Sequence, residues 1–326
     1  MNQLVSLADI QQAAARIRPV ARVTPLLDLS PALPASSGAK RLSVKCENLQ
    51  PAGAFKIRGA YNMLAQLDEA ERSRGVVTYS SGNHAQSLAL AAHLLGIRAV
   101  IVMPTTAPDI KIAGTRRYGA EVLFEGTTTL ERKARAEAEA SARGLTMVPP
   151  FDHPWIIAGQ GTIGLEIVDQ CPGVETVYVQ VGGGGLISGI AAAIRRVKPT
   201  FKIIGVEPAG APKMSTSLKA GRPVTLPRTA SVADGLLAVR PGDLTFVHVQ
   251  ALVDEVVTVE DAAILGALRW LFGEAKLVVE PSGAITVAAA LGGTGGRFDG
   301  PAVAVLSGGN VAPEAFARYL TGPDRL

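Results

Sequence analysis

One lysine in this sequence is placed to act as a nucleophile. Lys56 lies in the stretch QPAGAFKIRGAY, residues 50–61, between Phe55 and Ile57, and a segment with apolar residues at helical spacing follows it. An apolar setting disfavours the ammonium form, so the amine of such a lysine can condense with a carbonyl as a Schiff base near neutral pH. Taken alone, Lys56 has an alternative interpretation as a surface lysine in the first turn of a helix.

A run of four glycines, Gly182, Gly183, Gly184 and Gly185, lies between a strand-like and a helix-like segment. Glycines let the backbone approach a ligand, and their N–H groups and the following helix N-terminus attract an anion, most often a phosphate. No Gly-Lys-Ser/Thr follows, so the run is not a Walker loop. A flexible turn and a dinucleotide site are the alternatives, the latter because Gly183, Gly185 and Ser188 have suitable spacing and Glu207 closes the next strand.

Three other turns carry polar side chains at the ends of predicted strands or the beginnings of helices. They are Ser80-Ser81-Gly82-Asn83-His84, Glu280-Pro281-Ser282-Gly283 and Ser307-Gly308-Gly309-Asn310. Such turns offer hydroxyl, amide and N–H groups to a carboxylate or phenolate, although each alone could be a helix cap. The four histidines, at positions 84, 93, 153 and 248, lack metal-ligand spacing, and we expect no metal site.

Helical and strand patterns alternate along much of the chain, which predicts parallel strands joined by crossover helices, the α/β class. The predicted strands are 41–47, 76–78, 99–103, 121–124, 176–181, 202–207 and 302–306, and the predicted helices include 57–70, 83–95, 109–118, 128–143, 156–169 and 186–198. Five prolines between residues 207 and 252 predict irregular loops there. We expect a small α/β domain, residues 52–148, inserted into a large domain made of residues 1–51 and 149–326.

Composition narrows the class of protein. The chain has 326 residues, of which 48% are hydrophobic, and a net charge of +4 from scattered basic residues. These values favour a compact enzyme and give no nucleic-acid footprint. The apolar stretch 85–103 is interrupted by polar residues, so we expect no membrane span, and the two cysteines and the absence of a signal-peptide pattern lead us to expect a cytoplasmic protein.

Together and in this order, the motifs GAFKIRGA, SSGNHAQ, AGQGT, VGGGG, ADG, EPSG and SGGN resemble those of the fold-type II pyridoxal-phosphate (PLP) enzymes. The resemblance is to the branch with threonine and serine dehydratases and serine racemase, and it runs from near Ser6 to beyond Asn310. It implies a tryptophan synthase β-like fold of two open parallel-sheet α/β domains. It also implies an enzyme of amino-acid catabolism, of the short type that lacks a C-terminal regulatory domain. The implied assembly is a homodimer or homotetramer.

The resemblance also assigns roles to individual residues. It implies that Lys56 holds the cofactor covalently and removes the substrate α-proton, that Asn83 binds the ring hydroxyl, and that Ser307 binds the pyridine nitrogen. Gly182 to Gly185 would bind the phosphate, and Phe55 would also lie at the cofactor. The implied substrate-binding residues are Ser80, Ser81, His84, Arg132, Phe151 and Gly235.

The implied reaction is α,β-elimination from a β-hydroxy-α-amino acid, which gives a 2-oxo acid and ammonia. A neutral hydroxyl at Ser307, in place of an acid, leaves the electron sink weaker and favours elimination over transamination. Ser81 stands where many dehydratases have alanine, and its hydroxyl could reprotonate the α-carbon as a racemase does. Threonine, serine, 3-hydroxyaspartate and phenylserine stay open as substrates, with an amino-acid racemase as the alternative and a dinucleotide-binding oxidoreductase as a further one.

One position departs from the pattern of this branch. Members that bind a divalent cation near the phosphate loop use a glutamate, a backbone oxygen four residues later and an acid two residues beyond that. Here the corresponding series is Glu207, Ala211 and Lys213, so a cation replaces the acid. We expect that this metal site is absent and that the Lys213 ammonium substitutes for the ion beside Glu207 or the cofactor phosphate, the alternative being a solvated loop lysine.

Overall fold

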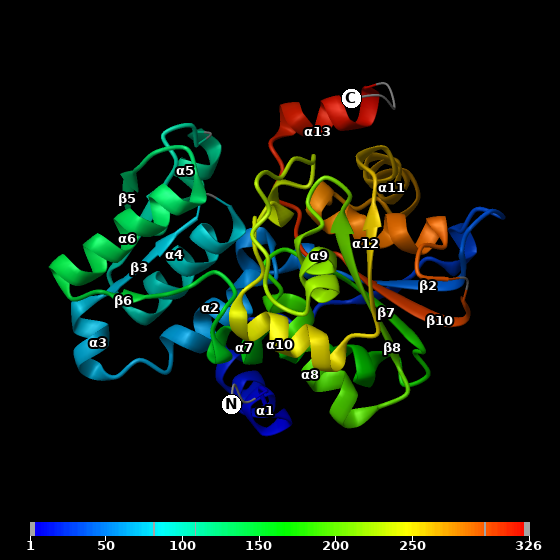
Figure 1. Cartoon of the computed structure of the whole chain (residues 1–326), viewed down its shortest axis with the longest axis horizontal. Helices are drawn as coiled ribbons and strands as arrows, with labels where there is room; N and C mark the ends of the chain where they lie inside the picture. The colour runs from blue at the N-terminus through cyan, green and yellow to red at the C-terminus, as the bar shows by residue number, and fades with distance from the viewer. Residues whose placement is uncertain (1–3, 81, 108, 297, 323–326) are drawn as a thin grey trace.

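The computed structural model describes residues 4–80, 82–107, 109–296 and 298–322. Its strands form two sheets, which lie in two lobes side by side (Figure 1). The six-stranded sheet has the order β1-β2-β10-β7-β8-β9, and all its neighbouring pairs are parallel except β1 with β2. Its strands are β1 (Leu26–Asp28), β2 (Ala39–Lys45), β7 (Thr176–Gln180), β8 (Lys202–Pro208), β9 (Glu255–Val259) and β10 (Phe298–Val305).

The four-stranded sheet is entirely parallel and has the order β5-β4-β3-β6. Its strands are β3 (Val76–Tyr79), β4 (Ala99–Met103), β5 (Glu121–Phe124) and β6 (Thr146–Met147). The α/β class with two parallel-sheet lobes is therefore confirmed. All strands of the second sheet lie within residues 52–148, although the domain boundaries themselves stay a prediction.

The helices connect and cover these sheets. Those of the first half of the chain are α1 (Leu7–Ile17), α2 (Lys56–Leu64), α3 (Glu69–Arg74), α4 (Asn83–Leu95), α5 (Asp109–Arg116) and α6 (Thr129–Arg143). The second half contains α7 (Pro154–Gln170), α8 (Gly185–Val197), α9 (Lys213–Ala220), α10 (Asp243–Leu252), α11 (Asp261–Ala275), α12 (Pro281–Gly292) and α13 (Pro313–Thr321). Short 3-10 turns lie at Ser30–Ala32, Glu47–Leu49, Pro51–Gly53 and Asp234–Leu236.

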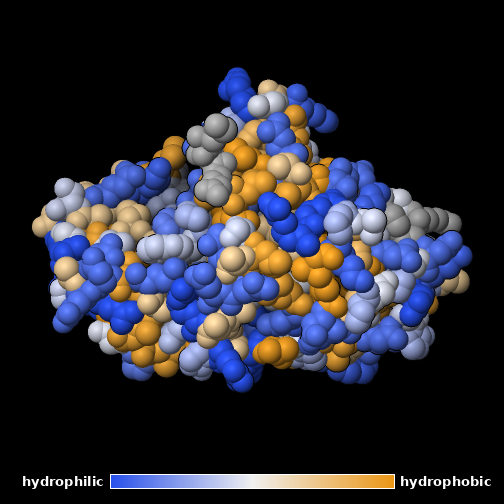
Figure 2. Space-filling view, turned by 90° about the horizontal axis from the view of Figure 1, so that it is seen from below, coloured by the Kyte–Doolittle hydropathy of each residue, from blue (hydrophilic) through white to orange (hydrophobic). Residues whose placement is uncertain are grey.

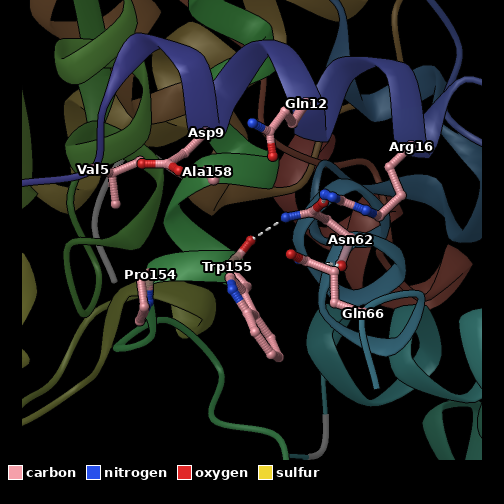
Figure 3. Close-up of a pocket in the computed structure, with 9 residues that line it drawn as sticks. All are labelled: Val5, Asp9, Gln12, Arg16, Asn62, Gln66, Pro154, Trp155 and Ala158. Carbon is pink, nitrogen blue, oxygen red and sulfur yellow. Dashed lines mark hydrogen bonds between the residues drawn. The ribbon is translucent and has the colours of Figure 1, made fainter. Parts of the chain in front are cut away.

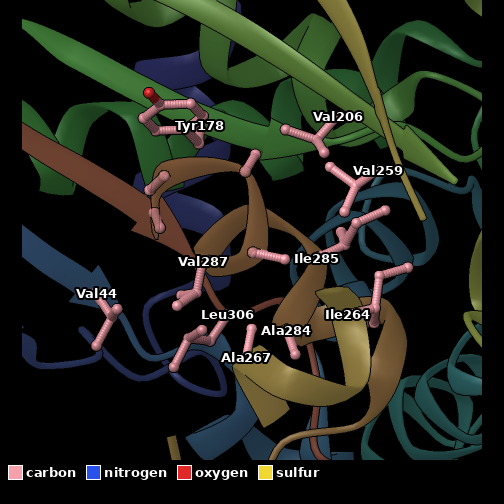
Figure 4. Close-up of a cluster of buried hydrophobic side chains, with 14 of the residues drawn as sticks. Val44, Tyr178, Val206, Val259, Ile264, Ala267, Ala284, Ile285, Val287 and Leu306 are labelled. Carbon is pink, nitrogen blue, oxygen red and sulfur yellow. The ribbon is translucent and has the colours of Figure 1, made fainter. Parts of the chain in front are cut away.

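The large sheet is buried on both faces, and strand β7 shows how. Its alternate residues Val177 and Val179 belong to the same apolar cluster as α8, whereas Tyr178 faces a second cluster formed with α11 and α12. Figure 4 shows this second cluster, with side chains of α11 and α12 facing those of the strands. This packing fixes the strand ends, from which the polar turns project.

Two expectations about local structure were wrong. The predicted helix 57–70 is two helices, because α2 ends at Leu64 and the Asp68 side chain accepts a hydrogen bond from Glu71 N as the N-cap of α3. The segment 207–252 is not wholly irregular, because it contains α9 and α10. Pro212 lies at the N-cap of α9, where its missing N–H costs no helix bond.

The surface around α1 and α8 mixes residue types. Figure 2 shows hydrophobic and hydrophilic residues interspersed across this face. Over the ranges that the structure describes, no helix is long and apolar enough to cross a bilayer.

Candidate active site

Lys56 is the first residue of α2, a helix that lies between the two lobes (Figure 1). Its Nζ donates a hydrogen bond of 2.6 Å to the carbonyl oxygen of Pro150 and lies 5.1 Å from the centre of the Phe55 ring. Burial lowers the pKa of Lys56 to about 8. The amine is therefore partly deprotonated near neutral pH, as a nucleophile or a general base requires.

The segment that accepts the Lys56 hydrogen bond also reaches the glycine run. Phe151 follows Pro150, and a Cβ atom added at Gly183 would lie 2.3 Å from the Phe151 ring. A Cβ atom at Gly185 would lie 2.9 Å from the Phe151 carbonyl oxygen. The structure thus brings the lysine and the glycines together, as the sequence motifs predicted, through a segment about 95 residues after Lys56.

Thr245 and Asp152, which no sequence motif singled out, support the glycine loop through the beginning of α10. Thr245 Oγ1 donates a 2.7 Å hydrogen bond to the carbonyl oxygen of Gly183, and Gly242 N donates one of 3.2 Å to the same oxygen. The Asp152 carboxylate accepts hydrogen bonds from the N–H groups of Asp243, Leu244 and Thr245 at 3.0 to 3.1 Å. Thr245 is 62 residues from Gly183, and Asp152 is 93 residues from Thr245, so local sequence patterns do not reveal these contacts.

A second group of polar side chains meets at the beginnings of α4 and α12. Asn83 Nδ2 donates a 2.6 Å hydrogen bond to Glu280 Oε1, and Asn83 Oδ1 accepts one of 2.9 Å from Asn310 Nδ2. Burial and the neighbouring Asp234 carboxylate raise the pKa of Glu280 to about 8. Glu280 is therefore mostly protonated and uncharged at pH 7.

The turn after β10 lies beside this group. Ser307 is 3% exposed, and its carbonyl oxygen accepts a 3.0 Å hydrogen bond from Phe55 N, while Gly308 forms a bridge with Ala54. A Cβ atom at Gly308 would lie 2.4 Å from Glu280 Oε1 and 3.0 Å from Asn83 Nδ2. Ser307 contacts Phe55, the residue before Lys56, and Gly308 lies beside Asn83. Ser307, Asn83 and Lys56 therefore lie around one region.

Of the predicted substrate residues, Gly235 lies beside the glycine loop. Its carbonyl oxygen would lie 3.2 Å from a Cβ atom at Gly182, and its N–H donates to Ser282 Oγ at 2.9 Å. Ser80 lies at the end of β3, where its Oγ accepts a 3.3 Å hydrogen bond from Gly82 N. Ser81 lies outside the residues that the structure describes.

The two remaining predicted substrate residues already have partners. His84 Nε2 lies 3.1 Å from Thr78 Oγ1 and 3.3 Å from the Val148 carbonyl oxygen. Burial, with the nearby charge of Lys56, lowers the pKa of His84 to about 3, so its ring is neutral. Arg132 donates hydrogen bonds to Thr127 and Thr129 at the beginning of its own helix. Roles for both in substrate binding stay predictions.

A buried ion network holds the helix that carries Lys56. The Arg58 guanidinium is 1% exposed and donates to both carboxylate oxygens of Glu47, at 2.7 and 2.8 Å, and of Glu166, at 2.6 and 2.9 Å. Glu47 follows β2, whereas Glu166 lies on α7. Arg58 thereby fixes α2 to two elements of the large lobe.

A pocket between α1, α2 and α7 is separate from this site. Figure 3 shows its lining, in which Asn62 donates a 2.6 Å hydrogen bond to the Trp155 carbonyl oxygen. Arg16 Nη1 donates to Asn62 Oδ1 at 2.6 Å, so these polar groups satisfy one another. None of the residues assigned above lines this pocket.

Comparison with known proteins assigns the family. The model of the family described as "Pyridoxal-phosphate dependent enzyme" matches residues 17–308. The chain belongs to this family. The enzyme is 45% identical to the L-threonine ammonia-lyase of Thermotoga maritima over 94% of its own length and 76% of that protein. It is 41% identical to the L-threo-3-hydroxyaspartate ammonia-lyase of a Pseudomonas species, over 98% of its own length and 100% of that protein.

Solved structures give the same result. The structure of maize serine racemase superposes on the enzyme with a TM-score of 0.92 and 40% identity, covering 97% of each chain. The fold-type II assignment and the branch with threonine dehydratases and serine racemases are therefore confirmed, and the cofactor is pyridoxal phosphate. The dinucleotide interpretation of the glycine run loses its support.

The residues present fit this cofactor. The buried amine of Lys56 can bind an aldehyde covalently, and the glycine loop packs so closely on Phe151 that Cβ atoms at Gly183 and Gly185 would clash with it. Gly184 has a φ of 102°, in the region that side chains disfavour. The loop thus depends on glycine for both its shape and its closeness to neighbouring residues.

We expect Gly184→Ala to weaken cofactor binding about tenfold or more. Alanine at this φ is strained by about 1–2 kcal/mol, and its Cβ would lie 2.8 Å from Thr245, so the free loop relaxes away from the cradle shape. Titration of the cofactor-free protein with pyridoxal phosphate, followed by fluorescence, measures the change. Gly173→Ala, where a Cβ meets nothing within 4 Å, should bind like the wild type. Equal affinity of all three proteins would contradict the role of the loop.

Proposed function

We propose that the enzyme is an ammonia-lyase that converts a β-hydroxy-α-amino acid of the threonine or serine type to a 2-oxo acid and ammonia. Its similarity to ammonia-lyases named for L-threonine and L-threo-3-hydroxyaspartate supports this reaction class. Water leaves in the elimination and is returned in the hydrolysis that releases ammonia, so the net reaction needs no oxidant or reductant.

In this proposal the residues that meet at the lobe junction hold pyridoxal phosphate. Lys56 holds its aldehyde carbon, the N–H groups of Gly182 to Gly185 hold its phosphate, Asn83 holds its ring hydroxyl, and Ser307 holds its pyridine nitrogen. Phe55 lies next to the Lys56 amine, 5.1 Å from the ring centre to Nζ. When bound, the cofactor supplies an electron-withdrawing ring that acidifies the α-proton of an attached amino acid.

The proposal mainly rests on the observation that Ser307, the proposed partner of the pyridine nitrogen, is a neutral hydroxyl. Ser307 is a neutral hydroxyl and the neighbouring Glu280 has a pKa of about 8, so neither is an anion ready at pH 7 to hold a proton on the pyridine nitrogen. A ring whose nitrogen is not held protonated withdraws electrons less strongly. This environment favours prompt loss of a β-hydroxyl over reactions that need long-lived negative charge.

Lys56 carries the proton transfer in the proposed reaction. When the amino group of the substrate displaces it, the Lys56 amine becomes free, and a pKa of about 8 suits it to accept the α-proton near neutral pH. The β-hydroxyl leaves as water after gaining a proton, which in net terms is the one that Lys56 removed from the α-carbon, and hydrolysis then releases the 2-oxo acid and ammonia.

Substrate recognition is proposed at the end of β3 and along the 150–151 segment. Ser80, Ser81 and adjacent N–H groups would hold the α-carboxylate, Phe151 and Gly235 would line the space for the β-substituent, and His84 and Arg132 are further candidates. Threonine, serine, 3-hydroxyaspartate and phenylserine all carry a β-hydroxyl and so can undergo the reaction. The apolar Phe151 favours phenylserine, but no relative described above is named for it.

An amino-acid racemase is the alternative, and the similarity to maize serine racemase favours it as the second candidate. The hydroxyl of Ser81 would then return a proton to the opposite face of the α-carbon. We expect Ser81→Ala to keep elimination within about threefold and to lower racemisation at least about a hundredfold, the size of a lost general acid. Equal loss of both activities would mean that Ser81 only binds the carboxylate.

One experiment separates these functions. The purified enzyme is incubated with each of the four β-hydroxy amino acids, and 2-oxo acid, ammonia and the enantiomeric composition of the remaining amino acid are measured. We expect equal amounts of 2-oxo acid and ammonia from at least one substrate. Inversion without ammonia would instead identify a racemase. A cytoplasmic location and a homodimeric or homotetrameric assembly stay predictions.

A further inference from the structure

Lys213 is a completely buried lysine that no step of the proposed reaction uses. It is the first residue of α9 and is 0% exposed. Its Nζ lies 2.6 Å from the carbonyl oxygen of Val181, 3.0 Å from that of Leu236 and 3.2 Å from that of Ala211. Glu207 Oε1, also completely buried, lies 3.1 Å away. The ammonium is therefore enclosed by four oxygen atoms from four segments, and the interpretation as a solvated loop lysine does not hold.

These oxygen atoms belong to the supports of the glycine loop. Val181 immediately precedes Gly182, and Leu236 immediately follows Gly235, whose carbonyl oxygen lies against Gly182. Ala211 lies in the turn between β8 and α9, and Glu207 lies near the end of β8. Lys213 therefore links the end of β8 to Val181, the residue at the entry of the glycine loop, and to Leu236 beside it.

The four oxygen atoms around Lys213 Nζ need a positive charge among them. Three carbonyl dipoles and one carboxylate converge on Nζ, and such a group of buried oxygens repels itself without a positive charge at its centre. The remaining acceptor capacity of Glu207 is used by Met214 N, Ser215 N and Ser215 Oγ at 2.8 to 2.9 Å. Burial lowers the pKa of Lys213, and the Glu207 carboxylate opposes this.

The residues at this position do not fit a divalent metal ion. Magnesium requires oxygen ligands at about 2.0–2.1 Å and calcium at about 2.3–2.6 Å. The four oxygens lie at 2.6 to 3.2 Å from Nζ, which are hydrogen-bond lengths, and Nζ occupies the point that an ion would need.

We propose that Lys213 is a built-in cation that holds the glycine loop in its phosphate-binding shape and makes the enzyme independent of divalent metal ions. Lys213 is a positioning residue, because it acts on the cofactor through Val181 and Leu236 and touches no reacting atom. The inference rests on the proposed role of the glycine loop but on neither the substrate nor the type of reaction.

The test converts the built-in cation into a metal site. In Lys213→Asp the new carboxylate joins Glu207 and the three carbonyl oxygens, so the variant should bind pyridoxal phosphate at least about tenfold more weakly without metal, as losses of supporting residues at ligand sites do. Adding Mg²⁺ or Mn²⁺ should restore the affinity and raise the melting temperature of this variant. The wild-type holoenzyme should respond to neither EDTA nor Mg²⁺.

Two further variants complete the design. Lys213→Met keeps the size of the side chain without its charge, so it should lose cofactor affinity, and Mg²⁺ should not restore it. Lys219→Asp makes the same charge change on the exposed part of α9 and should behave like the wild type. These readouts are cofactor affinity and melting temperature, so they stay informative even if the enzyme proves to act on an unexpected substrate.

Three results would overturn the proposal. One is a wild-type enzyme that loses cofactor affinity in EDTA and regains it with Mg²⁺. Another is wild-type cofactor affinity in Lys213→Met. The third is weak binding by Lys213→Asp that no divalent ion restores. If Lys213→Asp does not fold, Lys213→Met and the EDTA experiment still decide the matter.

Discussion

Replacing Lys56 by alanine is expected to lower turnover by at least about 10⁴-fold, the upper range for a lost proton-transferring group. The same change should remove the visible absorption of the lysine-linked cofactor. Both effects follow from one amine, which is held at the lobe junction with a pKa of about 8 and lies 2.6 Å from the Pro150 carbonyl oxygen. Absorption spectra and ammonia release measure the two effects on the same sample.

Two variants serve as controls for this prediction. Lys56→Arg keeps a positive charge and most of the packing but cannot form a covalent link to the cofactor, so it should be as inactive as Lys56→Ala. Lys40→Ala removes a lysine whose side chain is 73% exposed and should leave both spectrum and turnover unchanged. Borohydride reduction followed by peptide mapping should place the cofactor on residue 56. A label on another lysine would refute the site assignment.

Replacing Arg58 by methionine is expected to lower the free energy of unfolding by about 3–5 kcal/mol. The change leaves Glu47, which is 0% exposed, and Glu166, which is 15% exposed, without the guanidinium that they share, so that Lys45 is the remaining cation paired with Glu166. The melting temperature of the holoenzyme, measured at fixed cofactor concentration, should fall by several degrees. Because Arg58 lies two residues after Lys56, cofactor affinity should fall as well.

Arg143 offers a matched control, since it also binds two carboxylates. Its guanidinium pairs with Glu121 and Glu139 at 2.7 and 3.3 Å, but its side chain is 27% exposed. Water and salt screen such a pair, so Arg143→Met should cost less than about 1 kcal/mol. Similar losses in the two variants would show that burial does not determine the strength of the Arg58 network.

The sequence by itself determined the elements and the motifs. Alternating patterns predicted helix 83–95 and strands 99–103 and 121–124 with the bounds that the structure has, because periodic apolar residues encode which face is buried. Glycine runs and polar turns at strand ends predicted where ligands bind, because parallel strands present their carboxyl ends at one edge. The pattern failed at α2, where only the capping interaction of Asp68 shows that a second helix begins.

Only the tertiary structure decided the protonation and the partners of the chemical groups. Lys56 meets a carbonyl 94 residues away, and Asn83 meets Glu280 at a separation of 197 residues. Lys213 could have been a solvated lysine or an internal cation, and the choice depended on carbonyl oxygens from Val181 and Leu236. The pKa of an ionisable group depends on burial and on charges within a few ångströms, and folding supplies both from distant parts of the chain.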